Sequence, residues 1–273
     1  MKRIISLIAL LSLILSACSA PVDEANQLIV GMECAYAPFN WTQVEESETS
    51  FLINNEEGTG YCDGYDVQIA KSIADELGKD LLVKKIAWEG LIDGLNNGEI
   101  DMIVAGMTDT VERREAVSFS TPYYQSDLVL IVRNDSAYAS ATSLVDFTGS
   151  TVVAQKGTFH DTVVDQIPTV KHMTPLGSFA LLTNSVVNKE ADAMVSEYPV
   201  ALSIVGTNPD LKIITFTAEN GFQTSFEDTT VSVAVRKNDT ELLSTINTVL
   251  ANLSEEARSE WMKDAIERQP EGE

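Results

Sequence analysis

The chain has 273 residues, 44% of them hydrophobic, which indicates a well-buried globular protein of one large or two medium domains. Its 41 acidic residues outnumber 18 lysines and arginines, giving a formal net charge of -23. This charge repels polyanions and leaves no basic stripe for a phosphate backbone, so the composition argues against nucleic-acid binding.

The first residues are typical of an export signal. Lys2 and Arg3 precede an apolar run, 4–15, that is too short to cross a bilayer as a permanent helix. Leu-Ser-Ala-Cys at 15–18 resembles the bacterial lipobox, so we expect residues 1–17 to be a signal peptide and Cys18 to carry a lipid. An ordinary signal peptide with an incidental cysteine is the alternative. With a lipid on Cys18, we expect residues 18–27 to form a flexible spacer and the protein to be anchored on the extracytoplasmic face of the cell membrane.

Two further cysteines follow the spacer. In an oxidising compartment Cys34 and Cys62 form a disulfide, or they are two separate buried thiols. The sequence has no Cys-x-x-Cys and no His/Cys cluster at metal-ligand spacing, so we expect neither a metal nor a cofactor.

Strands and helices alternate through the first half of the chain. Residues 28–33 are predicted to be a buried strand, and 43–60 a polar surface hairpin or loop. The spacing in 66–77 predicts a helix with Asp66 as its N-cap and Gly78 just past its end. The other elements expected here are a strand at 81–88, a helix at 89–98 and a nearly continuous apolar strand at 100–106.

The alternation resumes after residue 150. Two lobes with doubly wound α/β sheets, joined by two crossings, account for the whole pattern. We place lobe 1 at 28–128 and 229–273, and lobe 2 at 129–228. The elements expected in this half are strands at 150–155, 191–197, 211–216 and 231–237, and helices at 157–167, 179–189 and 239–267, the last long enough for two.

Open α/β sheets bind ligands at the carboxyl ends of their strands, where loop amides and helix N-termini converge. The residues at these ends are Glu33, Tyr36, Trp88, Gly106 and Thr108 in the first lobe, and Gln155, Thr158, Phe159 and Glu197 in the second.

A basic residue also follows the strand at 100–106. Thr110 can cap a helix that places Arg113 in its first turn, where a cation opposes the helix dipole. A carboxylate ligand gripped by the guanidinium would compensate for that placement. The alternative is a salt bridge to a neighbouring acid.

Three runs resemble one known family. YAPFNW (36–41), GYDVQIAKSIADELG (64–78) and WEGLIDGLNNGEIDMIVAGMTDTVERREAVSFSTPYY (88–124) are similar to the family 3 extracellular solute-binding proteins, the amino-acid receptors of ABC uptake systems. The resemblance extends over about 28–266. It implies a periplasmic-binding-protein type II fold, two lobes that close around an amino acid, delivery to a membrane permease, a monomer and no catalysis.

The resemblance also implies a role for each site residue. Arg113 would bind the ligand α-carboxylate, while the Gly106 carbonyl, the Thr108 hydroxyl and Glu197 would meet the α-amino group. The family usually has Asp at the position of Glu197. Tyr36 and Trp88 would be aromatic walls, with core packing as their alternative. Gln155, Thr158 and Phe159 would be the contacts from lobe 2, with another side chain of Thr-Phe-His in the cleft as the alternative to Phe159.

The side chain most informative about specificity is Glu33. An acid at the end of a buried strand favours a cationic ligand, so we expect a basic amino acid, arginine before lysine. Because family members that bind glutamine also carry an acid here, a polar neutral ligand is the alternative. A sensor that presents its ligand to a receptor and a dehydratase derived from the same fold are the other classes, although His160 and His172 alone cannot build a catalytic array.

Overall fold

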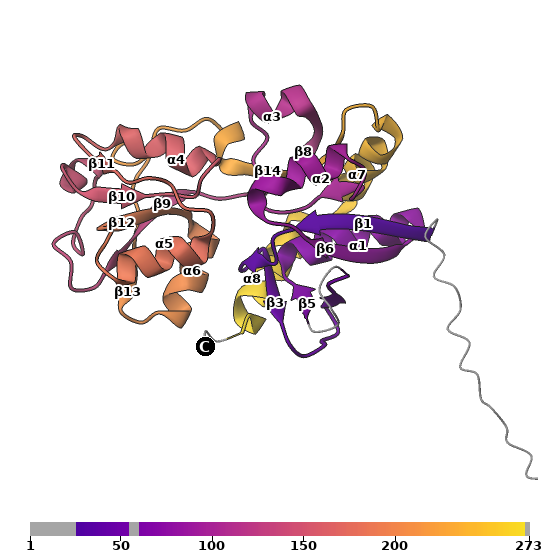
Figure 1. Cartoon of the computed structure of the whole chain (residues 1–273), viewed down its shortest axis with the longest axis horizontal. Coiled ribbons are helices and arrows are strands. Elements are labelled where there is room, and N and C mark those ends of the chain that lie inside the picture. The colour runs from indigo at the N-terminus through magenta and orange to yellow at the C-terminus, as the bar shows by residue number, and fades with distance from the viewer. Residues whose placement is uncertain (1–25, 55–59, 271–273) are drawn as a thin grey trace, which may run out of the picture.

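The computed structural model describes residues 26–54 and 60–270. The expected signal peptide, Cys18 and most of the spacer therefore lie outside the described residues. The described chain forms two α/β lobes that lie side by side (Figure 1).

The first lobe is built on a five-stranded sheet. Its strand β1 pairs in parallel with two neighbours, whereas the last strand of the chain runs antiparallel to the strands on either side of it. The expected strand at 100–106 is shorter than predicted: only Met102–Ile103 pair as strand, and the backbone takes a positive φ at Gly106. In sheet order the strands are β6 (Asp80–Lys85), β1 (Gln27–Met32), β7 (Met102–Ile103), β14 (Thr230–Arg236) and β8 (Val117–Gln125).

The longer helices of this lobe bury apolar side chains in its core. The expected N-cap Asp66 is wrong: Gly64 precedes the first helix, and Asp66 is buried inside it, accepting hydrogen bonds from Asn40 and Tyr123. Gly78 ends the helix in the left-handed conformation, as predicted. The helices of this lobe are α1 (Tyr65–Leu77), η2 (Trp88–Gly90), α2 (Leu91–Asn96), α3 (Val111–Ala116), α7 (Thr240–Asn252) and α8 (Glu255–Arg268).

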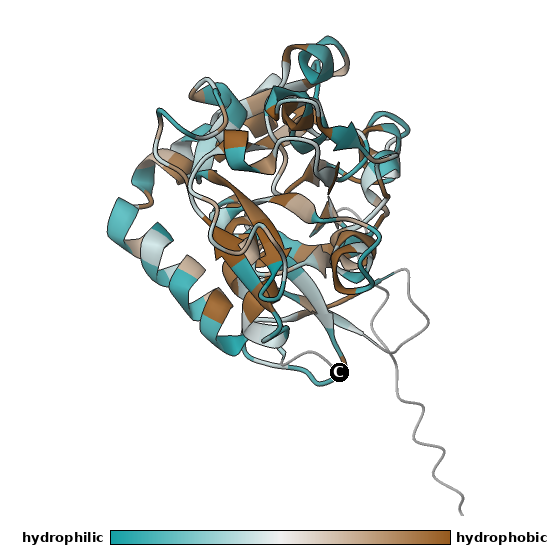
Figure 2. Cartoon of the chain, turned by 90° about the vertical axis from the view of Figure 1, so that its left-hand side faces the viewer, coloured by the Kyte–Doolittle hydropathy of each residue, from teal (hydrophilic) through white to brown (hydrophobic). Residues whose placement is uncertain are grey.

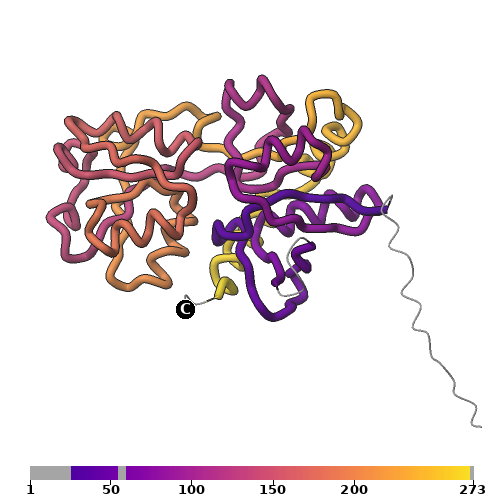
Figure 3. The backbone as a smooth tube through the Cα atoms, viewed as in Figure 1, coloured from indigo at the N-terminus to yellow at the C-terminus, as the bar shows by residue number. Residues whose placement is uncertain are grey.

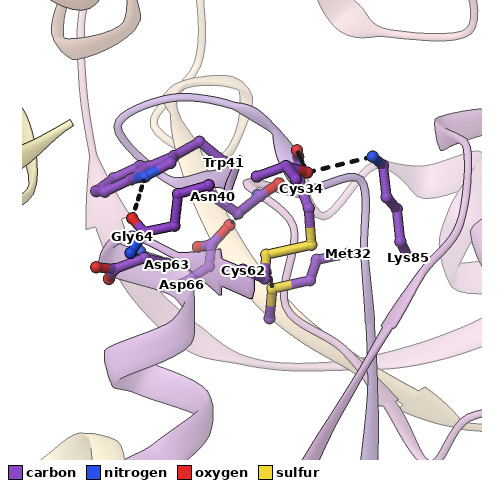
Figure 4. The surroundings of a disulfide bond; sticks show 11 residues. Met32, Cys34, Asn40, Trp41, Cys62, Asp63, Gly64, Asp66 and Lys85 are labelled. Atoms are coloured by element: carbon purple, nitrogen blue, oxygen red, sulfur yellow. Dashed lines mark hydrogen bonds between the residues drawn. A yellow bond between two sulfur atoms is a disulfide. The ribbon is translucent and has the colours of Figure 1, made fainter. Parts of the chain in front are cut away.

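A second, small sheet lies beside the first in lobe 1. The stretch 43–60, expected to be a surface hairpin or loop, contains the short strand β4 (Phe51–Leu52). The order of this sheet is β2 (Ala35–Tyr36), β3 (Asn40–Gln43), β5 (Tyr61–Asp63) and β4. Cys34 and Cys62 form a disulfide at the base of this sheet, with their Cα atoms 5.6 Å apart (Figure 4). The disulfide joins the segment that follows β1 to β5.

The second lobe repeats the plan with a five-stranded sheet of its own. Parallel strands lie on one side, and β9 runs antiparallel between its two neighbours. In sheet order the strands are β11 (Lys171–His172), β10 (Thr151–Val153), β12 (Ala193–Glu197), β9 (Leu128–Arg133) and β13 (Leu211–Ile214). The helices are η3 (Leu144–Phe147), α4 (Phe159–Val163), η4 (Val164–Gln166), α5 (Phe179–Val187) and α6 (Tyr198–Thr207).

Two crossings join the lobes, one between β8 and β9 and the other between β13 and β14, where η5 (Glu227–Thr229) lies (Figure 3). They lie side by side, because the Ser126 amide donates to the Thr229 carbonyl at 3.0 Å. Hydrophobic residues gather in the strands at the centre of the molecule, and hydrophilic residues lie mainly on the outer helices (Figure 2). In the part of the chain described, no helix combines the length and apolarity needed to cross a bilayer.

Candidate ligand-binding cleft

The predicted site residues converge on one pocket between the lobes. Nine of the ten border it directly, and Glu197 lies behind its wall, where it contacts Tyr36 and His160. The lining residues are Glu33, Tyr36, Trp88, Gly106, Thr108 and Arg113 from lobe 1, and Gln155, Thr158, Phe159 and His160 from lobe 2.

Strand ends bring these residues together. Glu33 directly follows β1, Gln155 comes two residues after β10, and Glu197 is the last residue of β12. Gly106 is required by its surroundings, since its φ is +57° and an added Cβ would lie 2.7 Å from the Tyr36 ring. Two sheets thus direct their carboxyl ends into one cleft.

Arg113 is the cation of the cleft. Thr110 caps α3 and accepts a hydrogen bond from the Arg113 amide at 3.3 Å, as expected. The guanidinium donates to the carbonyls of Thr108 at 2.7 Å and Gly157 at 3.0 Å, and it lies 4.8 Å from the centre of the Trp88 ring. Burial lowers the pKa of Arg113 to about 10.

The partners of Arg113 differ from those of its neighbour. Arg114 is exposed and forms a bidentate pair with Asp109 at 2.6 Å, whereas the ion pairs observed among the described residues do not include Arg113. The alternative expectation, that Arg113 forms a salt bridge with a neighbouring acid, is therefore not met among the described residues. A guanidinium that meets neutral carbonyls and an aromatic face keeps an uncompensated charge, which attracts an anion.

Glu33 is a buried acid that lines the same pocket as Arg113, with 9% of its surface exposed. Gln155 from the other lobe donates to it at 3.4 Å. Burial raises the pKa of Glu33 to about 7, although hydrogen bonds from Gln155 and the Trp88 backbone partly offset that rise. A cation placed beside this carboxyl would favour its ionised form.

Glu197 is the second acid of the site. Tyr36 from lobe 1 donates its hydroxyl hydrogen bond to Glu197, and His160 Nε2 lies 3.3 Å from the other carboxylate oxygen. Burial alone would raise the pKa of Glu197, but His160 and the bond from Tyr36 outweigh it, so this pKa lies below its ordinary value. Burial beside these acids raises the pKa of Tyr36 well above its usual range.

The aromatic residues pack on protein groups as well as on the pocket. Tyr36 stacks on Phe39 with 5.3 Å between ring centroids, and its ring lies 4.8 Å from that of Phe179, from lobe 2, in a tilted arrangement. Trp88, expected as a wall for a ligand side chain, has Arg113 over its ring. Thr158 donates to the Gln155 carbonyl at 2.7 Å, which fixes the loop before α4.

Sequence reasoning did not place His160 in the site. The helical pattern of 157–167 indicates a helix, but it does not indicate which of two adjacent residues at the start of a five-residue helix faces the cleft. In the structure both Phe159 and His160 border the pocket.

Fold and cleft together define a class: a two-lobed α/β binding protein whose ligand pocket lies between the lobes. The chain belongs to the bacterial extracellular solute-binding proteins of family 3, whose sequence profile matches residues 28–264. This membership supports the expected location outside the cytoplasm and a role in solute binding.

Individual relatives resemble the chain over most of its length. An ABC transporter arginine-binding protein 1 from Escherichia coli is 27% identical over 255 residues, covering 93% of this chain and 96% of that protein. The ABC transporter glutamine-binding protein GlnH from Bacillus subtilis is 27% identical over 214 residues, covering 76% of this chain and 75% of that protein.

A solved structure extends the likeness to three dimensions. The amino acid ABC transporter substrate-binding protein AbpA of Streptococcus pneumoniae, bound to L-arginine, superposes with a TM-score of 0.74 at 26% identity, covering 89% of this chain and 95% of that one. The expected two-lobed type II fold is thereby confirmed.

Proposed function

We propose that this protein captures a polar L-amino acid, arginine before lysine, between its two lobes and delivers it to the permease of an ABC importer. The observation that carries the proposal is the placement of Arg113 and Glu33 in one pocket, with Glu197 behind its wall. The guanidinium suits an α-carboxylate, Glu197 suits an α-ammonium group, and Glu33 suits a cationic side chain.

The relatives support this ligand class, since the Escherichia coli protein is named for arginine and the Streptococcus pneumoniae structure holds L-arginine. Glutamine is the second candidate, and a specific observation favours it. With a pKa of about 7, Glu33 is partly protonated at neutral pH, and a protonated carboxyl can donate to an amide oxygen.

A thermal-shift screen of the twenty amino acids tests the proposal. A ligand that binds the folded state alone stabilises it by about 2.7 kcal/mol at a hundred times its Kd. We expect arginine to give the largest shift, and a flat response to all twenty would rule out the proposed function.

Arg113→Ala examines the site itself. Loss of the partly buried guanidinium should abolish the shift by arginine while leaving a cooperative unfolding transition. Arg114→Ala is the matched control, because that residue pairs with Asp109 at the surface, and it should bind like the wild type. Micromolar affinity retained by Arg113→Ala in calorimetry would contradict the assignment.

We further propose that Cys18 carries a diacylglyceryl anchor after removal of residues 1–17, holding the monomer beside its permease. Labelling with radioactive palmitate should mark the wild-type protein in its bacterial host and leave Cys18→Ala unlabelled. Equal labelling of the two would mean that the cysteine is incidental.

A further inference from the structure

His160 is the one residue bordering the pocket for which the proposed function has no use. The residue is 8% exposed, and its Nε2 lies 3.3 Å from Glu197 Oε1. The ring packs edge-on against Phe179, with 6.0 Å between centroids. Its other nitrogen, Nδ1, is buried and has no hydrogen-bond partner among the described residues.

This arrangement makes Glu197 a shared group. His160 holds one carboxylate oxygen and the Tyr36 hydroxyl holds the other. His160 and Glu197 both belong to lobe 2, so their contact does not depend on how the lobes are arranged, whereas Tyr36 belongs to lobe 1. A ligand ammonium group that approaches Glu197 therefore meets a carboxylate that already interacts with the imidazole of His160.

We propose that His160 is a specificity-determining residue that sets how much negative charge Glu197 presents to the α-ammonium group of the ligand. An imidazolium neutralises Glu197 and competes with the ligand, whereas a neutral imidazole donates one hydrogen bond and leaves the carboxylate charge in place. Binding to the protonated form expels one proton from His160 to the solvent. The inference rests on the proposed function, because it assumes an α-ammonium ligand.

Histidine side chains ordinarily change charge between about pH 5 and 8, so the titrations span that interval. The charged and titratable groups around the ring are Glu197 on β12, Tyr36 on β2, and Glu33 and Arg113 across the pocket. On its own helix, Asp161 is engaged elsewhere, by His172 at 2.7 Å. Phe179 on α5 adds an apolar face.

Calorimetric titration of the intact protein with arginine, in buffers of different ionisation enthalpy, counts the protons released at pH 6 and pH 8. The variant is His160→Gln, whose amide can still donate to Glu197 but does not titrate. His172→Gln is the matched control, since the chain has two histidines and this one lies at the surface between Asp161 and Asp165. Glu33 is present in all three proteins, so the comparison between them reports on His160.

We expect the wild type and His172→Gln to release more protons at pH 6 than His160→Gln, by up to one per ligand. Their affinity should also rise more steeply with pH, by up to tenfold per unit. The difference should vanish for 5-guanidinopentanoate, the arginine analogue without an α-amino group. His160→Ala, checked for cooperative unfolding, serves if the glutamine side chain disturbs the fold.

Two results would overturn the inference. If His160→Gln and the wild type release the same number of protons while both bind arginine, His160 is a packing residue and the proposed function stands. If no amino acid binds the wild type at all, the inference and the proposed function fail together.

Discussion

Burial holds the pKa of Glu33 at about 7, so this carboxyl is largely protonated in mildly acidic solution. Pairing with a guanidinium side chain requires the ionised form. We therefore expect the arginine affinity to fall as the pH drops below about 7, by up to tenfold per unit. The unliganded protein should change in the opposite sense, because a raised carboxyl pKa favours the folded state as the pH falls from about 7 toward 4.5.

Calorimetry with arginine at pH 5.5 and 8 measures this dependence. The variant Glu33→Gln should lose the part of the pH dependence that comes from Glu33, and it should show a lower preference for arginine over glutamine. An unchanged preference in that variant would mean that Glu33 does not select the ligand.

At the scale of residues, the strand ends allowed most of the candidate site to be predicted. Glu33, Gln155 and Glu197 all follow or end parallel strands, so alternation of elements alone was enough to place them together. The partners of Trp88 and His160 could not be predicted, since they depend on side-chain directions between elements that are distant in sequence. Trp88 meets Arg113, which is 25 positions further along the same lobe.

At the scale of elements, the cap of α3 both begins the helix and positions the Arg113 backbone. Thr110→Ala should therefore cost about 1 kcal/mol of stability and also weaken arginine binding. Ser254→Ala is the matched control, because Ser254 caps α8 in the same way at 3.2 Å from the Ala257 amide, away from the cleft. Thermal unfolding and calorimetry on both variants give the comparison, and equal loss of affinity would argue against a special role for the α3 cap.

The disulfide is a second element-scale feature, since Cys34 lies between the site residues Glu33 and Tyr36. Cross-linking residues 28 positions apart stabilises the folded state by about 3 to 4 kcal/mol in the loop-entropy model. Replacing both cysteines by serine should lower the midpoint of thermal unfolding and weaken arginine binding together. Lowered stability with full affinity would limit the disulfide to a structural role.

The elements with strong periodicity were predicted well, and the short ones were not. The 66–77 helix pattern and the Gly78 stop were correct because an apolar stripe and a left-handed glycine are local signals. Asp66 looked like a cap, yet it is buried because Asn40 and Tyr123 satisfy its carboxyl, a tertiary compensation with no local signature. The two-residue strand Phe51–Leu52 likewise exists through its pairing with β5.

At the scale of the whole molecule, an ion pair crosses from one lobe to the other beside the pocket. Lys156 of lobe 2 lies 2.6 Å from Glu89 of lobe 1, and both are exposed. Reversing either charge should weaken arginine binding about two- to fivefold and speed its dissociation, whereas exchanging both charges should restore the wild-type values.

The exchange of Lys84 and Glu99 provides the control, because that pair lies within lobe 1 and should leave binding unchanged. Stopped-flow dissociation at low and high salt measures the effect, which should fade as salt screens exposed charges. If the single charge-reversal variants bind arginine like the wild type at low salt, the Lys156–Glu89 pair contributes nothing to closure of the lobes.

The position of β14 between β7 and β8 has a consequence for the order of folding. All strands of lobe 2 come from one continuous stretch, but the sheet of lobe 1 lacks an inner strand until residues 230–236 have been synthesised. A chain emerging from its N-terminus can therefore complete the inserted lobe while the flanking one still exposes two unpaired strand edges. For export machinery and chaperones that meet the nascent protein, lobe 1 is therefore the aggregation-prone part, because it is completed later.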